Sequence, residues 1–199
     1  DQPEQSEVDS QPQMPIPDGW VERLQWLINN PNREALAAVI TAPHYDPREA
    51  YMWVFLGAAI YGMPRIYASV DANTDLITSI ALSLSFVAIR ITIEFIGQNW
   101  VFQRIAVMYG GDTEGYGRVQ AGRGILYPVV LILQSIAVVF LLFNDVVGSI
   151  LLTAVIMIDL LFTTFVVQKI NGFHRTKALL MVGTTYTVII FFNSIFLGA

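Results

Sequence analysis

Residues 124–168 read GILYPVVLILQSIAVVFLLF-ND-VVGSILLTAVIMIDLLFTTFVVQ. The two apolar runs, 124–143 and 146–168, are each near the ~20 residues that a helix needs to cross the hydrocarbon core of a bilayer. Only Asn144 and Asp145 separate these runs, so the two helices must turn back on each other. The stretch therefore predicts a tight antiparallel pair of transmembrane helices.

The composition of the whole chain agrees with a membrane environment. The 199 residues are 54% hydrophobic and 14% charged, whereas an average soluble domain is about 25% charged. The formal net charge of -5 leaves no basic surplus for nucleic-acid binding. The absence of cysteine excludes thiolate metal sites and cysteine nucleophiles.

Three further apolar stretches of similar length flank the antiparallel pair. They cover about 50–70, 75–97 and 178–198. Together with the pair, they predict an all-α membrane protein whose domain at 46–199 is a bundle of five transmembrane helices.

The basic residues sort to one side of such a five-span bundle. With five spans, the N-terminal region, the 98–123 loop and the 169–177 loop face the same compartment. Nine of the 11 Lys and Arg residues fall in these regions, while Arg65 falls on the other side and Arg90 lies within a span. Because cytoplasmic loops carry an excess of Lys and Arg, we expect a multi-pass membrane protein with a cytoplasmic N-terminus and an extracytoplasmic C-terminus.

The region before the first span contains a tail and two short helices. Residues 1–17 are polar, acidic and rich in Gln and Pro, which predicts a disordered tail. Asp18 is expected to cap the first of two cytoplasmic amphipathic helices within 18–45. Four apolar residues repeat along this helix as a stripe: Trp20, Leu24, Leu27 and Ile28. The stripe predicts contact with a membrane surface or partner helix, or packing against the protein's own bundle.

The glycine-rich segment GGDTEGYGRVQAGRG (110–124) superficially suggests a phosphate-binding loop. A P-loop needs Lys and then Ser or Thr after its last glycine, whereas Arg123 and Gly124 occupy those places. We therefore interpret the segment as a flexible cytoplasmic connection. The two histidines, His44 and His174, have no second histidine at a metal-binding spacing. We expect no metal, no cofactor and no catalytic residues.

Charges inside the predicted spans are the most informative polar residues. Charged side chains at membrane depth are costly and are usually paired or functional. Arg90 and Glu94 are four residues apart in the second span, and Asp159 is near the middle of the fourth. Similar depths predict that Arg90 meets Asp159 between these spans, with Glu94 nearer the cytoplasmic interface. The alternative interpretation of this intramembrane charge cluster is a path for protons or ions.

The order of several short motifs resembles that of the Yip family, the Ypt/Rab-interacting membrane proteins. The matching features over residues 18–198 are a W-x-x-x-L-x-W-L-I-x-N-P segment from Trp20 to Pro31, Gly110-Gly111 after the second span, Tyr127-Pro128 at the start of the third, and Phe173-His174-Arg175-Thr176-Lys177-Ala178 before the last. The resemblance implies five spans and a cytoplasmic N-terminus. It implies no catalytic residue.

Eukaryotic members of that family are linked to vesicle trafficking and bind prenylated Rab-type GTPases. Their Asp-Leu-Tyr-Gly-Pro stretch before the first span is missing here. The corresponding place reads His44-Tyr45-Asp46-Pro47-Arg48. This departure argues against GTPase binding and favours the broad prokaryotic-like branch.

These features predict a non-enzymatic integral membrane scaffold or adaptor. Such a protein would be an accessory subunit of a larger membrane complex or a trafficking-type Yip-family protein. The expected partners are the lipid bilayer and other membrane-protein subunits. The alternative is a small permease or ion-channel component that uses Arg90, Glu94 and Asp159.

Overall fold

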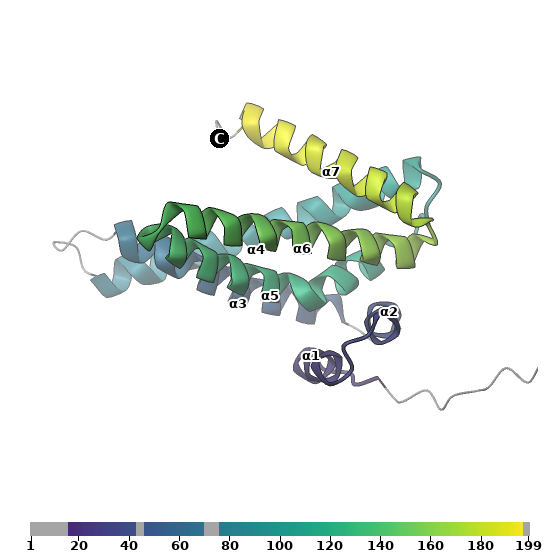
Figure 1. Ribbon diagram of the computed structural model, residues 1–199, viewed down its shortest axis with the longest axis horizontal. Helices are drawn as coiled ribbons and strands as arrows, with labels where there is room; N and C mark the ends of the chain where they lie inside the picture. The colour runs from purple at the N-terminus through teal and green to yellow at the C-terminus, as the bar shows by residue number, and fades with distance from the viewer. Residues whose placement is uncertain (1–15, 43–45, 70–75, 197–199) are drawn as a thin grey trace, which may run out of the picture.

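The computed structural model describes residues 16–42, 46–69 and 76–196, and these residues form helices joined by short turns. Residues 1–15 of the predicted tail, and His44, lie outside the described residues. The helices, in chain order, are α1 (Trp20–Asn29), α2 (Arg33–Thr41), α3 (Pro47–Ser69), α4 (Leu76–Met108), α5 (Tyr116–Phe143), α6 (Asp145–Asn171) and α7 (Arg175–Phe196) (Figure 1).

Among the described helices, α4, α5 and α6 are long and apolar enough to cross a membrane. The protein is therefore membrane-embedded, and the part of the chain that the structure describes is all-helical. The predicted antiparallel pair is confirmed, because α5 and α6 are separated by Asn144 alone. The Asn144 side chain caps α6 by accepting hydrogen bonds from the backbone N–H groups of Val146 and Val147, both at 3.1 Å. Gly148 then lies so close to Leu141 that a Cβ would not fit.

The long helices form a bundle in which α5 packs against α3 on one side and α6 on the other (Figure 1). One buried cluster joins α3, α4 and α5 and includes Val54, Ala88, Phe95 and Leu131. A second cluster joins α4, α6 and α7 and includes Phe102, Val167, Ala178 and Met181. The helix α7 contacts α6 and α4. Ala88, Phe95 and Phe102 recur every seven residues, so the two clusters follow each other along the same face of the long helix α4.

The short helices α1 and α2 lie across one end of the bundle, near the turn between α6 and α7 (Figure 1). The expected Asp18 cap is wrong, because Gly19 is the N-cap residue of α1 and its side-chain position offers no acceptor. The backbone N–H of Trp20 instead donates to Glu49 Oε1 at 2.7 Å. A carboxylate from α3 therefore satisfies a helix-end donor that the sequence assigned to a local cap.

The predicted loop at 98–123 is much shorter than expected. Helix α4 continues to Met108 and α5 begins at Tyr116, so only residues 109–115 lie between these helices. The reason is tertiary, since Phe102 and Ala106 on the extension of α4 are fully buried. A 33-residue helix is about 50 Å long, which exceeds the ~30 Å hydrocarbon core of a bilayer. The bundle therefore extends beyond the hydrocarbon.

Candidate functional site

A fully buried arginine lies where the extension of α4 packs against the beginning of α5. Arg123 is 1% exposed. Its Nη1 donates to Asn99 Oδ1 at 2.7 Å and its Nη2 faces Gln98 Oε1 at 3.5 Å. No carboxylate from the described residues forms an ion pair with Arg123. Amide oxygens therefore take the place that an acid usually occupies beside a buried cation.

Aromatic rings surround the same guanidinium group. The Arg123 Cζ lies 4.7 Å from the ring centroid of Phe102, 5.4 Å from that of Tyr127 and 5.5 Å from that of Phe95. The rings of Phe95 and Tyr127 also contact each other, with their centroids 4.8 Å apart. The negative faces of aromatic rings attract a cation, and the attraction grows when water is excluded. The rings thus compensate part of the cost of burying this charge.

Several buried polar atoms in this part of the bundle have no hydrogen-bond partner among the described protein groups. They include Arg123 Nε, Asn99 Nδ2 and Gln103 Oε1. Leaving a buried donor or acceptor unpaired costs about 1–3 kcal/mol. The interior between α4 and α5 therefore has hydrogen-bonding capacity that the described protein groups leave unused.

Asp159 contacts α7 rather than α4. Tyr186 Oη donates a hydrogen bond to Asp159 Oδ2 at 2.6 Å. The Tyr186 ring meets Phe102 edge-on, with centroids 5.4 Å apart. The predicted ion pair between Asp159 and Arg90 is absent, since neither of the ion pairs within the described ranges joins them.

Arg90 pairs within its own helix. Its Nε donates to Glu94 Oε1 at 2.9 Å, and the two side chains are 59% and 38% exposed. Exposed apolar side chains, Phe86 and Ile93, lie on the same part of α4. The predicted three-residue cluster is therefore divided into an outer ion pair and a separate Asp159–Tyr186 contact. The prediction used only the depths of Arg90 and Asp159 along their spans. Depth does not determine how each helix is rotated about its axis, and that rotation decides which side chains meet.

The predicted apolar stripe of α1 is also divided. Trp20 is buried, stacks on Trp53 with centroids 4.4 Å apart, and its Nε1 lies 3.1 and 3.0 Å from the carbonyl oxygens of Gly124 and Ile125. By contrast, Leu24 and Leu27 are half-buried and Ile28 is exposed. Trp20 therefore packs against the protein's own bundle, which is the second of the two alternatives for the stripe.

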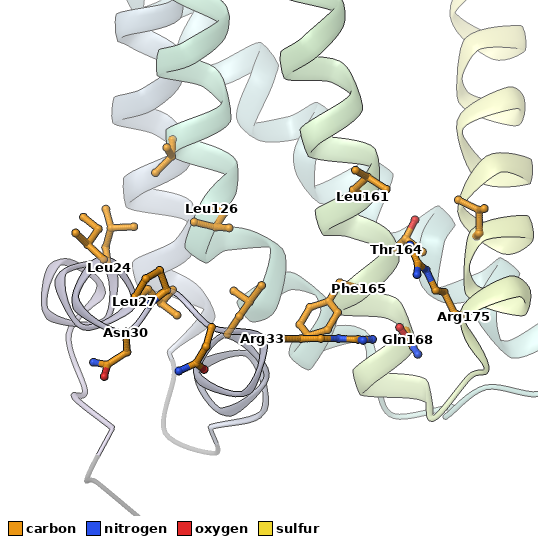
Figure 2. A pocket seen from close by; sticks show the side chains of 16 residues that line it. Leu24, Leu27, Asn30, Arg33, Leu126, Leu161, Thr164, Phe165, Gln168 and Arg175 are labelled. Carbon is orange, nitrogen blue, oxygen red and sulfur yellow. The ribbon is translucent and has the colours of Figure 1, made fainter.

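An apolar groove of about 810 Å³ lies between α1, α2, α5, α6 and α7. Figure 2 shows its lining, in which Arg33 reaches from α2 beneath Phe165 and Arg175 reaches from α7 toward α6. Half of the lining residues are Leu, Ile or Val, and they include Leu27, Leu126, Leu161 and Leu179. The apolar groove thus combines hydrocarbon walls with two cationic side chains, and none of the described residues that line it is acidic.

Two of the motif positions form the turn after α4. Gly110 has φ +78°, a left-handed conformation that glycine adopts at little cost. A Cβ at Gly111 would lie 2.5 Å from Asn171 Oδ1 and 2.9 Å from the Phe173 ring. The Asn171 side chain also accepts a hydrogen bond from the Asp112 backbone N–H at 3.1 Å. The Gly-Gly turn therefore packs directly against the turn between α6 and α7.

The motif positions beside that second turn have different environments. His174 is exposed, and Ala178 is fully buried in the α4–α6–α7 cluster. Lys177 Nζ lies 4.6 Å from the centroid of the Phe173 ring. These contacts show that Phe173 and the first turn of α7 pack against their surroundings, whereas His174 does not.

Tyr127 and Pro128 do not open a helix. They lie inside α5, which begins at Tyr116. Pro128 faces Gly57 of α3 so closely that a Cβ on the glycine would lie 3.1 Å from the proline Cα. Glycine thus permits α3 to approach α5 at this point.

The predicted flexible connection at 110–124 is wrong for most of its length. From Tyr116 onward it is part of α5, and Val119 through Ile125 are buried. At Gly122 a Cβ would lie 2.9 Å from Val166 Cγ1 and 3.1 Å from Ile40 Cγ2. The glycines of this segment therefore serve close helix packing, for which glycine spacing alone gives no distinctive signal.

Arg123 and its amide partners were missed because they fall within the predicted loop. One signal could have found them. The residues Val101, Phe102, Ile105 and Ala106 recur at helical spacing, which favours a continuing helix over a loop.

Comparison with known proteins finds no matching family model, no matching curated protein and no matching solved structure. The resemblance to the Yip family therefore stays a prediction from the motifs.

Proposed function

We propose that this protein is a non-enzymatic scaffold that works as an accessory subunit of a larger membrane complex. Its partner is a second membrane-protein subunit, which packs against the outer face of α4. The observation that supports this proposal is the Arg90–Glu94 ion pair, which is exposed on a helix apolar enough to cross a membrane.

The ion pair and the face of α4 that carries it are both directed away from the rest of the bundle. Charged side chains at membrane depth usually face a bundle interior, a water-filled cavity or another polar group, whereas Arg90 and Glu94 face outward from their own bundle. Of the three helices that are apolar enough to cross a membrane, α4 is the least buried inside the protein. The buried share of its apolar segment is 17%, compared with 39% for α5 and 33% for α6. A partner helix with a polar group would cover both the ion pair and the apolar side chains around it.

The topology that we propose has five spans, with α3 and α7 joining α4, α5 and α6. The basic residues of α1, of α2 and of the helix ends beside the α6–α7 turn support it, because α1, α2 and that turn lie at the same end of the bundle (Figure 1). That end would be cytoplasmic by the positive-inside rule. Reporter tags at the two termini should then report opposite compartments, and finding both on one side would exclude an odd number of spans.

The proposed subunit role is tested by affinity purification of the tagged full chain in mild detergent. Quantitative mass spectrometry should find one membrane protein in stoichiometric amount. The double variant R90Q/E94Q removes both charges without changing the net charge, and the partner should be lost. The matched control D112N/R118Q removes another exposed ion pair, outside the α4 face, and should retain the partner. Retention by both variants would contradict the proposal.

The polar interior favours a second candidate, a small permease or channel component. Buried groups without partners lie between α4 and α5, and Asp159 meets Tyr186 between α6 and α7. This candidate expects ion flux in liposomes that contain the purified chain alone. The D159N variant should abolish that flux, whereas R90Q/E94Q should leave it unchanged. Absence of flux together with a stoichiometric partner would favour the subunit role.

A further inference from the structure

Two cationic side chains line the apolar groove, and a third cation lies against the Phe165 ring of its wall. Arg33 Cζ lies 5.3 Å from the centroid of the Phe165 ring, and Lys169 Nζ lies 5.7 Å from the same centroid. Arg175 lines the groove from the first turn of α7. The ion pairs that the described part of the chain contains involve none of these three residues. This part of the groove therefore carries positive charge that no ion pair among the described residues neutralises.

The start of α7 increases this positive potential. A helix N-terminus is equivalent to roughly half a positive charge, so acidic residues or bound anions stabilise it. The first turn of α7 has no acidic residue and contains Arg175 and Lys177 instead. An anion bound near this helix end would supply the negative charge that the first turn lacks.

The remaining walls of the groove suit hydrocarbon. Leu126 and Leu161 face it from α5 and α6, and Leu179 faces it from α7. Both α5 and α6 are apolar enough to cross a membrane. The groove therefore runs along two helices that are apolar enough to contact lipid, and its cations come from the helix ends of α2, α6 and α7.

From this geometry we propose that the apolar groove binds one anionic phospholipid. The lipid phosphate lies between Arg33 and Arg175, and an acyl chain lies along Leu126, Leu161 and Leu179. Basic pockets between membrane helices are recognised sites for anionic headgroups. Inorganic phosphate alone would leave the hydrocarbon walls uncovered, and a zwitterionic lipid would bring its own cation against the two arginines.

The test uses the full chain, purified in detergent and stripped of lipid. Phosphatidylglycerol, phosphatidylcholine or inorganic phosphate is added, and native mass spectrometry counts the molecules bound per chain. One phosphatidylglycerol should bind at least about tenfold more tightly than phosphatidylcholine, with no stable phosphate adduct. Equal binding of the two lipids, or binding of inorganic phosphate alone, would overturn the proposal.

Variants then locate the bound lipid. R33Q/R175Q should weaken phosphatidylglycerol binding about tenfold or more, and L179W should block the acyl chain. R104Q is the matched control, because Arg104 is exposed and stacks on Trp100 rather than lining the groove. Unchanged circular dichroism confirms that each variant is folded. Undiminished lipid binding by R33Q/R175Q would refute the site.

This inference depends on membrane embedding but not on the proposed subunit role. The R90Q/E94Q variant alters a different face of the protein and should keep its bound lipid. A protein partner that occupies the groove would be detected as a complex that L179W disrupts and phosphatidylglycerol does not displace. That result would overturn the lipid proposal and show that the groove binds a protein.

Discussion

Two arginines on adjacent helices of the bundle have opposite environments. Arg90 lies on the outer face of α4, forms an ion pair with Glu94 four residues later and remains largely exposed. Arg123 of α5 is completely buried, has no acidic partner among the described residues, and is held by two amide oxygens and three aromatic rings. Each charge is compensated, but by different chemistry.

The difference shows which charge belongs to the fold and which is available for binding. Removing Arg123 would leave buried amide groups unpaired, so the bundle itself depends on this residue. Removing Arg90 would uncover little, because its partner is on the same helix and reaches the surface. We therefore expect substitutions in the interior to change stability and those on the outer face to change association.

The largest effect is expected for Arg123→Met. The substitution keeps much of the side-chain volume but leaves the oxygens of Asn99 and Gln98 without their donor. The free energy of unfolding should fall by about 3 kcal/mol, measured by denaturant titration in detergent with circular dichroism. Arg123→Lys should be intermediate, since it retains the charge but loses the planar fork. Wild-type stability of Arg123→Met would remove the contrast between the two arginines.

Trp20 tests how strongly α1 is attached to the bundle. Trp20→Ala removes the stacking on Trp53 and the Nε1–H donor, and should lower the free energy of unfolding by about 2–3 kcal/mol. Trp20→Phe should cost only about 1 kcal/mol, because it keeps a ring and loses the hydrogen bond. Thermal unfolding followed by circular dichroism measures both.

The control for Trp20 is Ile28→Ala, at an exposed position of the same stripe. Its effect on stability should stay within about 0.5 kcal/mol. Equal effects of Trp20→Ala and Ile28→Ala would show that the contact between α1 and the bundle does not depend mainly on Trp20, its first residue.

A smaller effect is expected where α5 meets α2 and α6. Gly122→Ala places a Cβ 2.9 Å from Val166 and 3.1 Å from Ile40, and should destabilise the protein by about 1–2 kcal/mol. Gly117→Ala, on the same helix, meets no atom within 4 Å. It should be neutral or stabilise by about 0.5–1 kcal/mol. Matching melting temperatures for the two variants would argue against the close contact at Gly122.

The smallest effect on stability is expected for R90Q/E94Q. An exposed pair of this spacing contributes about 0.5 kcal/mol or less, so the purified chain should unfold as the wild type does. The same preparation should have lost its stoichiometric partner. A loss of more than about 1.5 kcal/mol would instead place this pair among the folding determinants.

The sequence predicted the membrane helices better than their surroundings. The apolar runs of α5 and α6 and the tight turn at Asn144 were correct, because about 20 consecutive apolar residues leave few alternatives. Residues 98–123 were misassigned as a loop. That segment contains polar and glycine residues, and its helices become stable only by packing against each other and against α2 and α6.

Local sequence also predicted the wrong partner for two residues. Arg90 was expected to contact Asp159 because their depths along the spans agree, but the rotation of each helix decides which side chains can meet. Trp20 was recognised as apolar, yet its hydrogen bonds to Gly124 and Ile125 link residues more than 100 positions apart. Spacing within α1 holds no information about that distant backbone.

The sequence by itself determined that the protein is embedded in a membrane and that its spans are helices, because the length and hydrophobicity of a segment are properties of that segment alone. Tertiary structure alone decided that Arg123 is buried, that Arg90 faces outward, and that Arg33 and Arg175 line the same groove. These outcomes depend on helix rotation and on contacts between distant segments. Both are set by how side chains of several helices pack together, a property that no single segment contains.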